Sequence, residues 1–368
     1  MKQSSKICML RRAAAPLLAA AFLLAVRSEG AGLSVVNLHS FDVFLNGAVP
    51  YASLVQGANG LLYGTTFEGG IDNAGVVFEV ASNGTMSALY TFTNGVDGGF
   101  PEAGLVLAND GNFYGTTYEG GTNGTGVVFK MTPAGGFSPL YSFTAIDKSG
   151  ENQDGAYPSA GLIQATDGNL YGVTSTGGAN GSGTLFKVSL GGSFGLVYTF
   201  SVVDIDGYNR EGSAPQAALV QSTDGNFYGT ADEGGSNGLG AVFEYVVSQS
   251  TVSPLYSFLG AGDGSKPLAA LVQGSDGDFY GTASEGGTNG FGSVFKIASG
   301  GAFTPLYSFA NGSDGGNPVA SLVQGANGNF FGTSTGPQSG FGTVFEMTTN
   351  GALSTLYTFT GGDDGAYP

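Results

Sequence analysis

The fold of this 368-residue chain is decided by DGNFYGTTYEGGTNGTGVVFKMTPAGGFSPLYSF, residues 110–143, because the same phrases return along the whole chain. An aromatic-Gly pair follows an apolar residue at Tyr63, Tyr114, Tyr171, Tyr228, Tyr280 and Phe331, at intervals of 51 to 57 residues. A Val/Leu-Phe-Glu/Lys phrase and a Leu/Val-Tyr-Ser/Thr-Phe phrase return with nearly the same steps. The chain therefore holds six full repeats, and Leu38-His39-Ser40-Phe41 is an additional relative of the last phrase.

Each repeat contains four short segments with strand character, separated by turn residues. In the fifth repeat these segments are 269–273, 279–282, 292–297 and 303–309, and Ser275-Asp276-Gly277-Asp278 between the first two suits a tight hairpin. Four strands repeated in tandem every 50 or so residues are typical of β-propeller blades. We predict an all-β propeller of six four-stranded repeats. A parallel β-solenoid is the alternative, although its coils are usually shorter and do not need hairpins.

Closure of the propeller is open to two interpretations. The segment 38–41 matches the fourth strand of a repeat, whereas Gly365-Ala366-Tyr367-Pro368 stands just before the place of another first strand. Either six blades close with one redundant strand, or the natural chain continues and a seventh blade is completed by the N-terminal segment.

Composition and charge exclude several classes of protein. The chain has 67 Gly and 13 Pro, yet 41% hydrophobic and 12% aromatic residues, which is too apolar for a disordered chain. The formal net charge is −17, and after residue 30 nothing resembles the basic stripe that a nucleic-acid binder needs. We expect no nucleic-acid partner.

The N-terminus has the pattern of a secretory signal peptide. Basic residues up to Arg12 precede an apolar run, 13–26, and a small-residue pattern ends at Gly30. We predict a signal peptide over residues 1–30, a propeller over 31–368, and a secreted, extracellular or cell-surface protein with no membrane span in the mature chain. An uncleaved N-terminal anchor is the alternative, but the run is shorter than the roughly 20 residues that a spanning helix needs. Cleavage would remove Cys8, the single cysteine, and with it thiolate and disulfide chemistry.

The phrases from Asp110 to Phe143 closely resemble the GloVer, or Gloeo/Verruco, tandem repeat. The resemblance covers about residues 34–368. It implies an exported bacterial repeat protein of a family with varied C-terminal anchors, and it brings no established catalytic residues. The Gly-Gly pairs are also loosely similar to kelch repeats, but the chain contains no Trp.

Two acidic sets are predicted to share one face of the disc, because the connection into the first strand and the one between the second and third strands emerge together. The first connection carries Asp97, Asp154, Asp206, Asp263, Asp314 and Asp364, and the second carries Glu68, Glu119, Glu233 and Glu285. These residues have three possible interpretations: turn formation with solubilising charge, calcium binding, or a glycosidase-like acid and base. The densest calcium candidates are Asp204, Asp206, Asn209 and Glu211.

Catalysis is not assigned to any residue. Repetition gives the four Glu equivalent surroundings, whereas an active site usually gives its two carboxylates different environments. His39, the single histidine, stands where other repeats place Tyr. Without a further His, or a Cys in the mature chain, the residues for a Ser-His-Asp triad or a zinc site are missing. We therefore expect a monomeric, non-enzymatic binding, adhesion or envelope-structure module for an extracellular polysaccharide or another surface protein, with calcium as a possible cofactor. An extracellular carbohydrate-active enzyme is the alternative.

Overall fold

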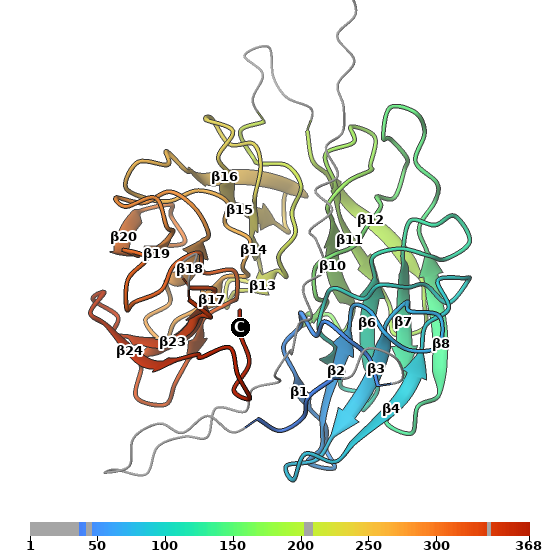
Figure 1. The fold of residues 1–368 in the computed structure, drawn as a ribbon. Helices are drawn as coiled ribbons and strands as arrows, with labels where there is room; N and C mark the ends of the chain where they lie inside the picture. Colours follow the sequence, from blue (N-terminus) through green and yellow to red (C-terminus); the bar gives the residue numbers. More distant parts are fainter. Residues whose placement is uncertain (1–36, 42–45, 202–208, 337–339) are drawn as a thin grey trace, which may run out of the picture.

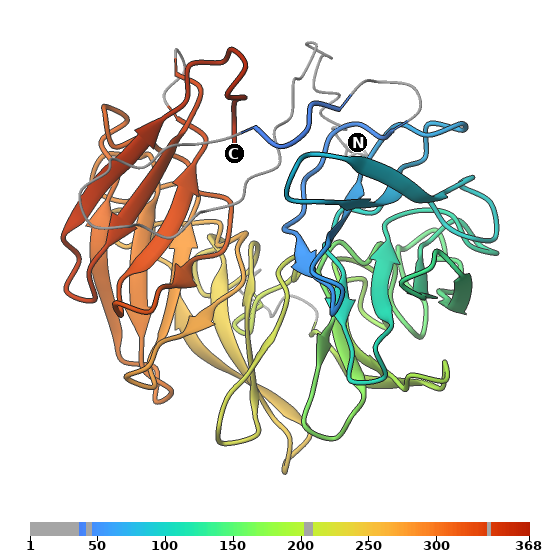
Figure 2. The ribbon, with the colours of Figure 1, turned by 90° about the horizontal axis from the view of Figure 1, so that it is seen from below.

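The computed structural model describes residues 37–41, 46–201, 209–336 and 340–368, and every regular element in these ranges is a β-strand. The strands form six four-stranded antiparallel sheets that stand around a ring as blades (Figure 1, Figure 2). Each sheet contains four strands that are consecutive in the chain and paired in sequence order. The prediction of a β-propeller of six four-stranded repeats is therefore confirmed. None of the described residues forms a helix long and apolar enough to cross a membrane.

The strand bounds repeat from blade to blade. They are β1 (Val55–Gln56), β2 (Leu62–Thr66), β3 (Val76–Val80) and β4 (Met86–Thr91) in blade 1; β5 (Val106–Leu107), β6 (Phe113–Thr117), β7 (Val127–Met131) and β8 (Phe137–Ser142) in blade 2; β9 (Ile163–Gln164), β10 (Leu170–Thr174), β11 (Thr184–Val188) and β12 (Phe194–Thr199) in blade 3; β13 (Val220–Gln221), β14 (Phe227–Ala231), β15 (Ala241–Val246) and β16 (Thr251–Ser257) in blade 4; β17 (Val272–Gln273), β18 (Phe279–Ala283), β19 (Ser293–Ile297) and β20 (Phe303–Ser308) in blade 5; and β21 (Val323–Gln324), β22 (Phe330–Ser334), β23 (Thr343–Met347) and β24 (Leu353–Thr358) in blade 6.

Aromatic residues hold neighbouring blades together. At four junctions a Tyr of the second strand lies against the Phe of the next blade's second strand, as in Tyr63–Phe113 with ring centroids 4.2 Å apart. Nearer the rim, Tyr90 stacks on Phe137 at 3.9 Å with the rings 9° from parallel. The second-strand Tyr residues are almost completely buried in four of the blades. The repeated aromatic phrases are therefore packing residues, which matches the packing role expected for them from the sequence.

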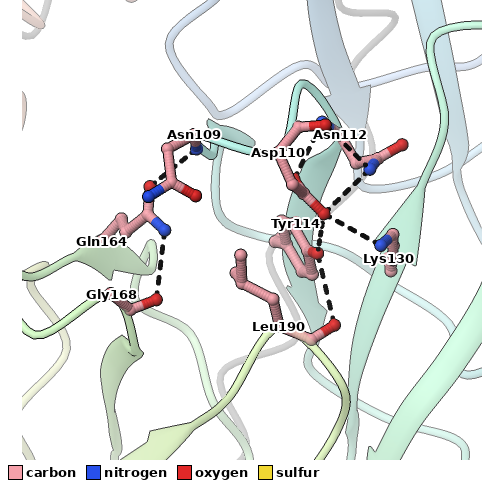
Figure 3. Close-up of polar contacts among 8 residues, drawn as sticks. All are labelled: Asn109, Asp110, Asn112, Tyr114, Lys130, Gln164, Gly168 and Leu190. Atoms are coloured by element: carbon pink, nitrogen blue, oxygen red, sulfur yellow. Dashed lines mark hydrogen bonds and ion pairs between the residues drawn. The ribbon is translucent and has the colours of Figure 1, made fainter.

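The hairpin turns between first and second strands also join neighbouring blades (Figure 3). The backbone N–H of Asn109 donates to Gln164 Oε1 at 2.8 Å, and Gln164 Nε2 donates to the Gly168 carbonyl at 3.1 Å, so one glutamine ties two hairpins. Gly111 has φ +77°, which its lack of a Cβ allows. Asp110 accepts hydrogen bonds from Tyr114 and Lys130. These hairpin turns thus link neighbouring blades and hold the strands of their own blade.

The segment 37–41 lies against blade 1 as the sequence repeat predicts. Phe41 is buried and packs on Phe78 with centroids 5.2 Å apart, as Phe92 packs on Phe129 at 5.4 Å. His39 stands edge-on to Phe41 as Tyr90 does to Phe92. Residues 38–41 therefore take the place of a fourth strand. The predicted signal peptide, 1–30, lies outside the described residues and stays a prediction.

Candidate functional site

The two acidic connections meet on the end of the disc opposite the hairpin turns. Gly99, in the connection from blade 1 to blade 2, pairs with Glu119, in the connection between β6 and β7. Beside this pair, the Tyr118 N–H donates to the Phe100 carbonyl at 3.1 Å. Equivalent pairs join Ala48 to Glu68, Ser213 to Glu233 and Ser265 to Glu285. The prediction that both connections share one face is confirmed.

The Asp residues of the first connection hold their own loops. Asp154 is 5% exposed and accepts from the Tyr141 hydroxyl at 2.6 Å, from the Thr144 N–H at 2.9 Å and from the Thr144 hydroxyl. We call this arrangement the carboxylate latch. All six tyrosines of the fourth strands donate to such a carboxylate at 2.6 to 3.0 Å, and the pairs are Tyr90–Asp97, Tyr141–Asp154, Tyr198–Glu211, Tyr256–Asp263, Tyr307–Asp314 and Tyr357–Asp364.

The latch explains why these carboxylates recur. Burial raises the pKa of Tyr90 to about 12, and Asp97 adds to the shift, so the phenol stays a donor at any physiological pH. Asp97 accepts hydrogen bonds from the Tyr90 phenol and from the Thr93 N–H, both partly buried, and so ties the loop to the fourth strand. Asp97, Asp154, Asp263 and Asp314 thus have a structural role on this face, and a ligand role for them stays a prediction.

In the third repeat the latch residue is Glu211, which the sequence presented as a calcium candidate. Glu211 is buried and accepts from the Tyr198 hydroxyl at 2.7 Å, and Asn209 donates to the Ser201 carbonyl. Asp206 was predicted for that position from its Asp-Gly context; it lies with Asp204 outside the described residues. Within the described ranges, no three His, Cys, Asp or Glu side chains gather as a metal site. Calcium binding stays a prediction.

The four Glu of the second connection occupy one repeat position but differ in exposure. Glu68 and Glu119 are half-buried, whereas Glu233 and Glu285 are exposed. Thr176 and Gly336 stand at the same position in the other two repeats. The backbone of these residues is held by the pairing described above, so the loop itself does not require a carboxylate there.

Three further positions on this face differ from repeat to repeat, and we call them the variable positions. They are the residue after the proline that leads into the first strand, the residue before the Glu position, and the left-handed residue before the next proline. In chain order the sets are Tyr51, Phe67 and Phe100; Glu102, Tyr118 and Tyr157; Ser159, Ser175 and Ala214; Gln216, Asp232 and Lys266; Leu268, Ser284 and Asn317; and Val319, Thr335 and Tyr367.

The backbone at these positions is fixed in every repeat. Phe100, for example, has φ +56° although it is not glycine, and its N–H donates to the Ala74 carbonyl at 2.7 Å. A left-handed conformation costs a residue with a side chain about 1–2 kcal/mol, so the surrounding hydrogen bonds must maintain it. A constant backbone thus presents different side chains in each blade.

The first two blades place five aromatic side chains at the variable positions. Tyr51 lies 5.4 Å from Phe67, Phe67 lies 5.3 Å from Phe100, and Tyr118 lies 5.1 Å from Tyr157, measured between ring centroids. The backbone hydrogen bond from Tyr118 to Phe100 joins the two groups. Tyr51 is 68% exposed and the other four are partly exposed. We call these five residues the aromatic strip.

An acidic pair adjoins the aromatic strip. Burial raises the pKa of Glu102 to about 7, and the negative charge of Glu119 adds to that shift. The pKa of Tyr118 is raised by burial and by the charges of Glu102 and Glu119, which places all three groups within electrostatic reach. Two neighbouring carboxyl groups, one of them with a raised pKa, are therefore present beside an aromatic ring.

Blade 4 has a different polar set at the same positions. Asp232 is 8% exposed, and its Oδ1 has no hydrogen-bond partner. Burial raises the pKa of Asp232 to about 6; a contact with Gln216 opposes the shift, the charge of Glu233 adds to it, and that of Lys266 opposes it. Sequence reasoning missed Glu102 and Asp232 because it looked for carboxylates that recur. An alignment of the six repeats could have found these residues. Their positions differ from repeat to repeat, although the Pro and Gly residues on either side are constant.

Comparisons with known proteins agree with the fold. The profile of the Gloeobacter/Verrucomicrobia repeat matches residues 25–213 and 204–368. No curated protein matches the chain. Candidate 6-phosphogluconolactonases from Bacteroides uniformis and Bacteroides fragilis are similar in structure, each with a TM-score of 0.56.

Identity to these two proteins is 14% and 18%, and each alignment covers 91% of this chain, with 94% and 92% of theirs. A protein from Lactobacillus plantarum has the same TM-score at 17% identity, with 86% of each chain covered. These likenesses concern the propeller fold alone. The repeat profile covers nearly the whole described chain, and the protein belongs to the Gloeobacter/Verrucomicrobia repeat family.

Proposed function

We propose that this propeller is an exported, non-enzymatic module that binds an extracellular polysaccharide through the aromatic strip. The observation that carries the proposal is the break in repeat symmetry: Tyr51, Phe67, Phe100, Tyr118 and Tyr157 gather on blades 1 and 2, while the other four blades together have one aromatic residue, Tyr367, at these positions. Partly exposed aromatic rings offer flat apolar faces, and tyrosine adds a polar tip. Sugar rings present C–H faces and hydroxyl groups that such a surface can contact together.

The charge of the chain favours this partner over a polyanion. The protein has a formal net charge of −17, and Glu102 and Glu119 adjoin the strip. Carboxyl groups accept hydrogen bonds from sugar hydroxyls, and a negative surface repels phosphate-rich polymers. A neutral polysaccharide outside the cell is therefore the ligand class that we propose, and adhesion or envelope structure is the process that such binding would serve. Another surface protein is the alternative partner.

The first experiment incubates the protein with a panel of neutral and acidic bacterial and plant polysaccharides, with and without calcium. Retention of the protein and release of reducing ends are both measured. Tyr51→Ala, at the most exposed ring, should weaken binding about tenfold, which corresponds to about 1.4 kcal/mol. Phe341→Ala is the matched control, since Phe341 is also an exposed aromatic residue but lies outside the variable positions. Equal losses in both variants, or no retention on any polysaccharide, would refute the proposal.

A second candidate function is supported by the acidic pair. The pKa of Glu102 is raised to about 7 beside a second carboxyl group, and glycosidases use a pair of carboxyl groups of which one has a raised pKa. If reducing ends are released and Glu102→Gln abolishes that release while binding survives, the protein is a carbohydrate-active enzyme. Release that is unaffected by Glu102→Gln would place catalysis elsewhere.

Export is a separate proposal with its own measurement. Expression of the full chain in a bacterial host, followed by fractionation and mass spectrometry, should find the protein outside the cytoplasm with a new N-terminus near residue 31. A full-length protein retained in the inner membrane would instead support an uncleaved anchor.

A further inference from the structure

Five of the six junctions between blades contain a shared hydrophobic core. Buried clusters join blade 1 to 2, 2 to 3, 3 to 4, 4 to 5 and 5 to 6, and each combines a second-strand aromatic or aliphatic residue with residues of the next blade. The remaining cluster contains Phe41, Val76, Phe78 and Val80, which belong to the segment 37–41 and to blade 1. Among the described residues, no such cluster joins blade 6 to blade 1.

The free face of blade 6 carries the residues that other blades bury. Val323 of β21 is 64% exposed, whereas Val272 and Val220 at the same position pack partly buried against their neighbouring clusters. Phe331 of β22 is partly exposed, whereas its equivalent Tyr280 is fully buried against Phe330. The face that other blades cover with their successor is thus incompletely covered in blade 6.

Blade 1 is also incompletely covered on its side of this junction. Leu62 of β2 is partly exposed, whereas Phe113, Leu170, Phe227, Phe279 and Phe330 at the same position are buried. On this side of blade 1, Phe41 of segment 37–41 packs with Val76, Phe78 and Val80. The Leu38 carbonyl lies against Gly84 as the Leu89 carbonyl lies against Gly135. Segment 37–41 therefore stands where the fourth strand of a preceding blade would stand, and the described part of the chain holds no three strands beside it.

Tyr367 and Pro368 have the same local geometry as Phe100 and Pro101, which lie in the connection from blade 1 to blade 2. Tyr367 has φ +53° and donates to the Phe341 carbonyl at 2.7 Å, as Phe100 has φ +56° and donates to the Ala74 carbonyl at 2.7 Å. Pro368 lies against Gly342 as Pro101 lies against Gly75. Figure 2 shows this end between blades 6 and 1, and Asn37 Nδ2 donates to the nearby Asp363 carbonyl at 2.9 Å. Residues 366–368 therefore lie in the junction with the same local geometry as residues 99–101, which lead into β5.

We infer that the junction between blades 6 and 1 is an acceptor site for the first three strands of one further repeat of this family, which residues 37–41 complete as the fourth strand. The five existing junctions specify the occupant. Its second strand must offer an aromatic or aliphatic residue to Phe331, as Phe330 offers one to Tyr280. Its remaining faces must pack on Leu62 and Phe41. The existing repeats of this chain make the equivalent contacts with their own neighbours.

The experiment extends the full chain after Pro368 with a copy of residues 268–298, which contain β17, β18 and β19. The matched control carries the same copy with Phe279→Ser and Phe295→Ser in the copied segment only. The first extension should raise the melting temperature by at least about 3 °C over both the parent and the control. Amide exchange at 323–331 and 37–41 should slow by at least about tenfold, because a covered strand opens less often.

Val323→Asp supplies the decisive cross-check. In the parent the substitution should leave the melt unchanged, since the side chain is exposed; in the extended protein it should remove the gain. Phe41→Ser should likewise cost more in the extended protein than in the parent. An intact extension that melts and exchanges like its control would overturn the inference. So would a parent already destabilised by Val323→Asp, because blades 6 and 1 would then be packed directly on each other.

Discussion

Asp154 and Asp232 are two carboxyl groups on the same face of the disc, almost equally buried at 5% and 8% exposure, yet their surroundings are opposite. Asp154 receives three hydrogen bonds from Tyr141 and Thr144 and has counterparts in every repeat. Asp232 has an oxygen without a partner and a pKa raised to about 6, and no other repeat has a carboxyl group at its position. Burial alone therefore does not distinguish a structural carboxylate from a candidate ligand group; the number of donors does.

The largest effect is expected from removing a latch carboxylate. Asp154→Ala leaves the Tyr141 hydroxyl and the Thr144 N–H without their acceptor, which should lower the free energy of unfolding by about 2–4 kcal/mol. Urea titration monitored by circular dichroism measures the change. Glu285→Ala, at an exposed position on the same face, is the control and should change stability by less than about 0.5 kcal/mol. Comparable losses would mean that the latch is not what distinguishes Asp154.

Asp232 should behave in the opposite way, and its effect should depend on pH. Its pKa is raised in the folded protein, so its contribution to stability is fully present below the unfolded value near 4 and is lost as pH rises to about 6. Asp232→Asn should therefore stabilise the protein by roughly 1–2 kcal/mol at pH 8 and by little at pH 4. Melting curves of the variant and the parent at pH 8 and pH 4 test this prediction. A variant that is less stable than the parent at pH 8 would show that the carboxylate is paired after all.

One latch lacks a donor, and this gives a stabilising prediction. Asp263 Oδ1 is buried without a partner, because Leu259 stands where Thr93 and Thr360 donate their hydroxyls to Asp97 and Asp364. Leu259→Thr should restore the hydrogen bond and raise the free energy of unfolding by about 1 kcal/mol. Leu259→Val, with a similar shape and no hydroxyl, separates the hydrogen bond from the loss of exposed apolar surface. Equal stability of the two variants would contradict the explanation.

The smallest effect is expected on the hairpin-turn end. Partial burial works against ionisation of Asp110, but hydrogen bonds from Asn112, Lys130 and Tyr114 lower its pKa overall. Lys130→Met should raise that pKa and lower stability at pH 7 by about 0.5 kcal/mol, since the ion pair is partly solvated. This part of the stability is present above pH 4 and falls as the carboxylate is protonated. NMR titration of Asp110 measures the shift; an unchanged pKa would show that Asn112 and Tyr114 suffice.

Much of the molecule could be predicted from the sequence. The spacing from Tyr63 to Phe331 determined the number of repeats, the Asp-Gly turns separated the strands, and the apolar phrases identified the faces that pack. These features are local: hairpin geometry depends on residues four apart, and alternation depends on neighbours. The sequence also placed both acidic connections on one face, because strand order in a meander fixes which ends meet.

Only the tertiary structure separated the acidic residues by role. The structural role of Asp154 and Glu211 follows from hydrogen bonds that the sequence did not reveal. Tyr141 and Tyr198, each 13 residues earlier, donate to these carboxylates. Glu102, Tyr118 and Tyr157 come from three different connections, and their proximity arises where adjacent blades meet. Hydrogen-bond donors, burial and the raised pKa of Glu102 all depend on that assembly. The sequence by itself determined the blade, whereas the packing of blades decided which of its carboxyl groups are satisfied and which are available to a ligand.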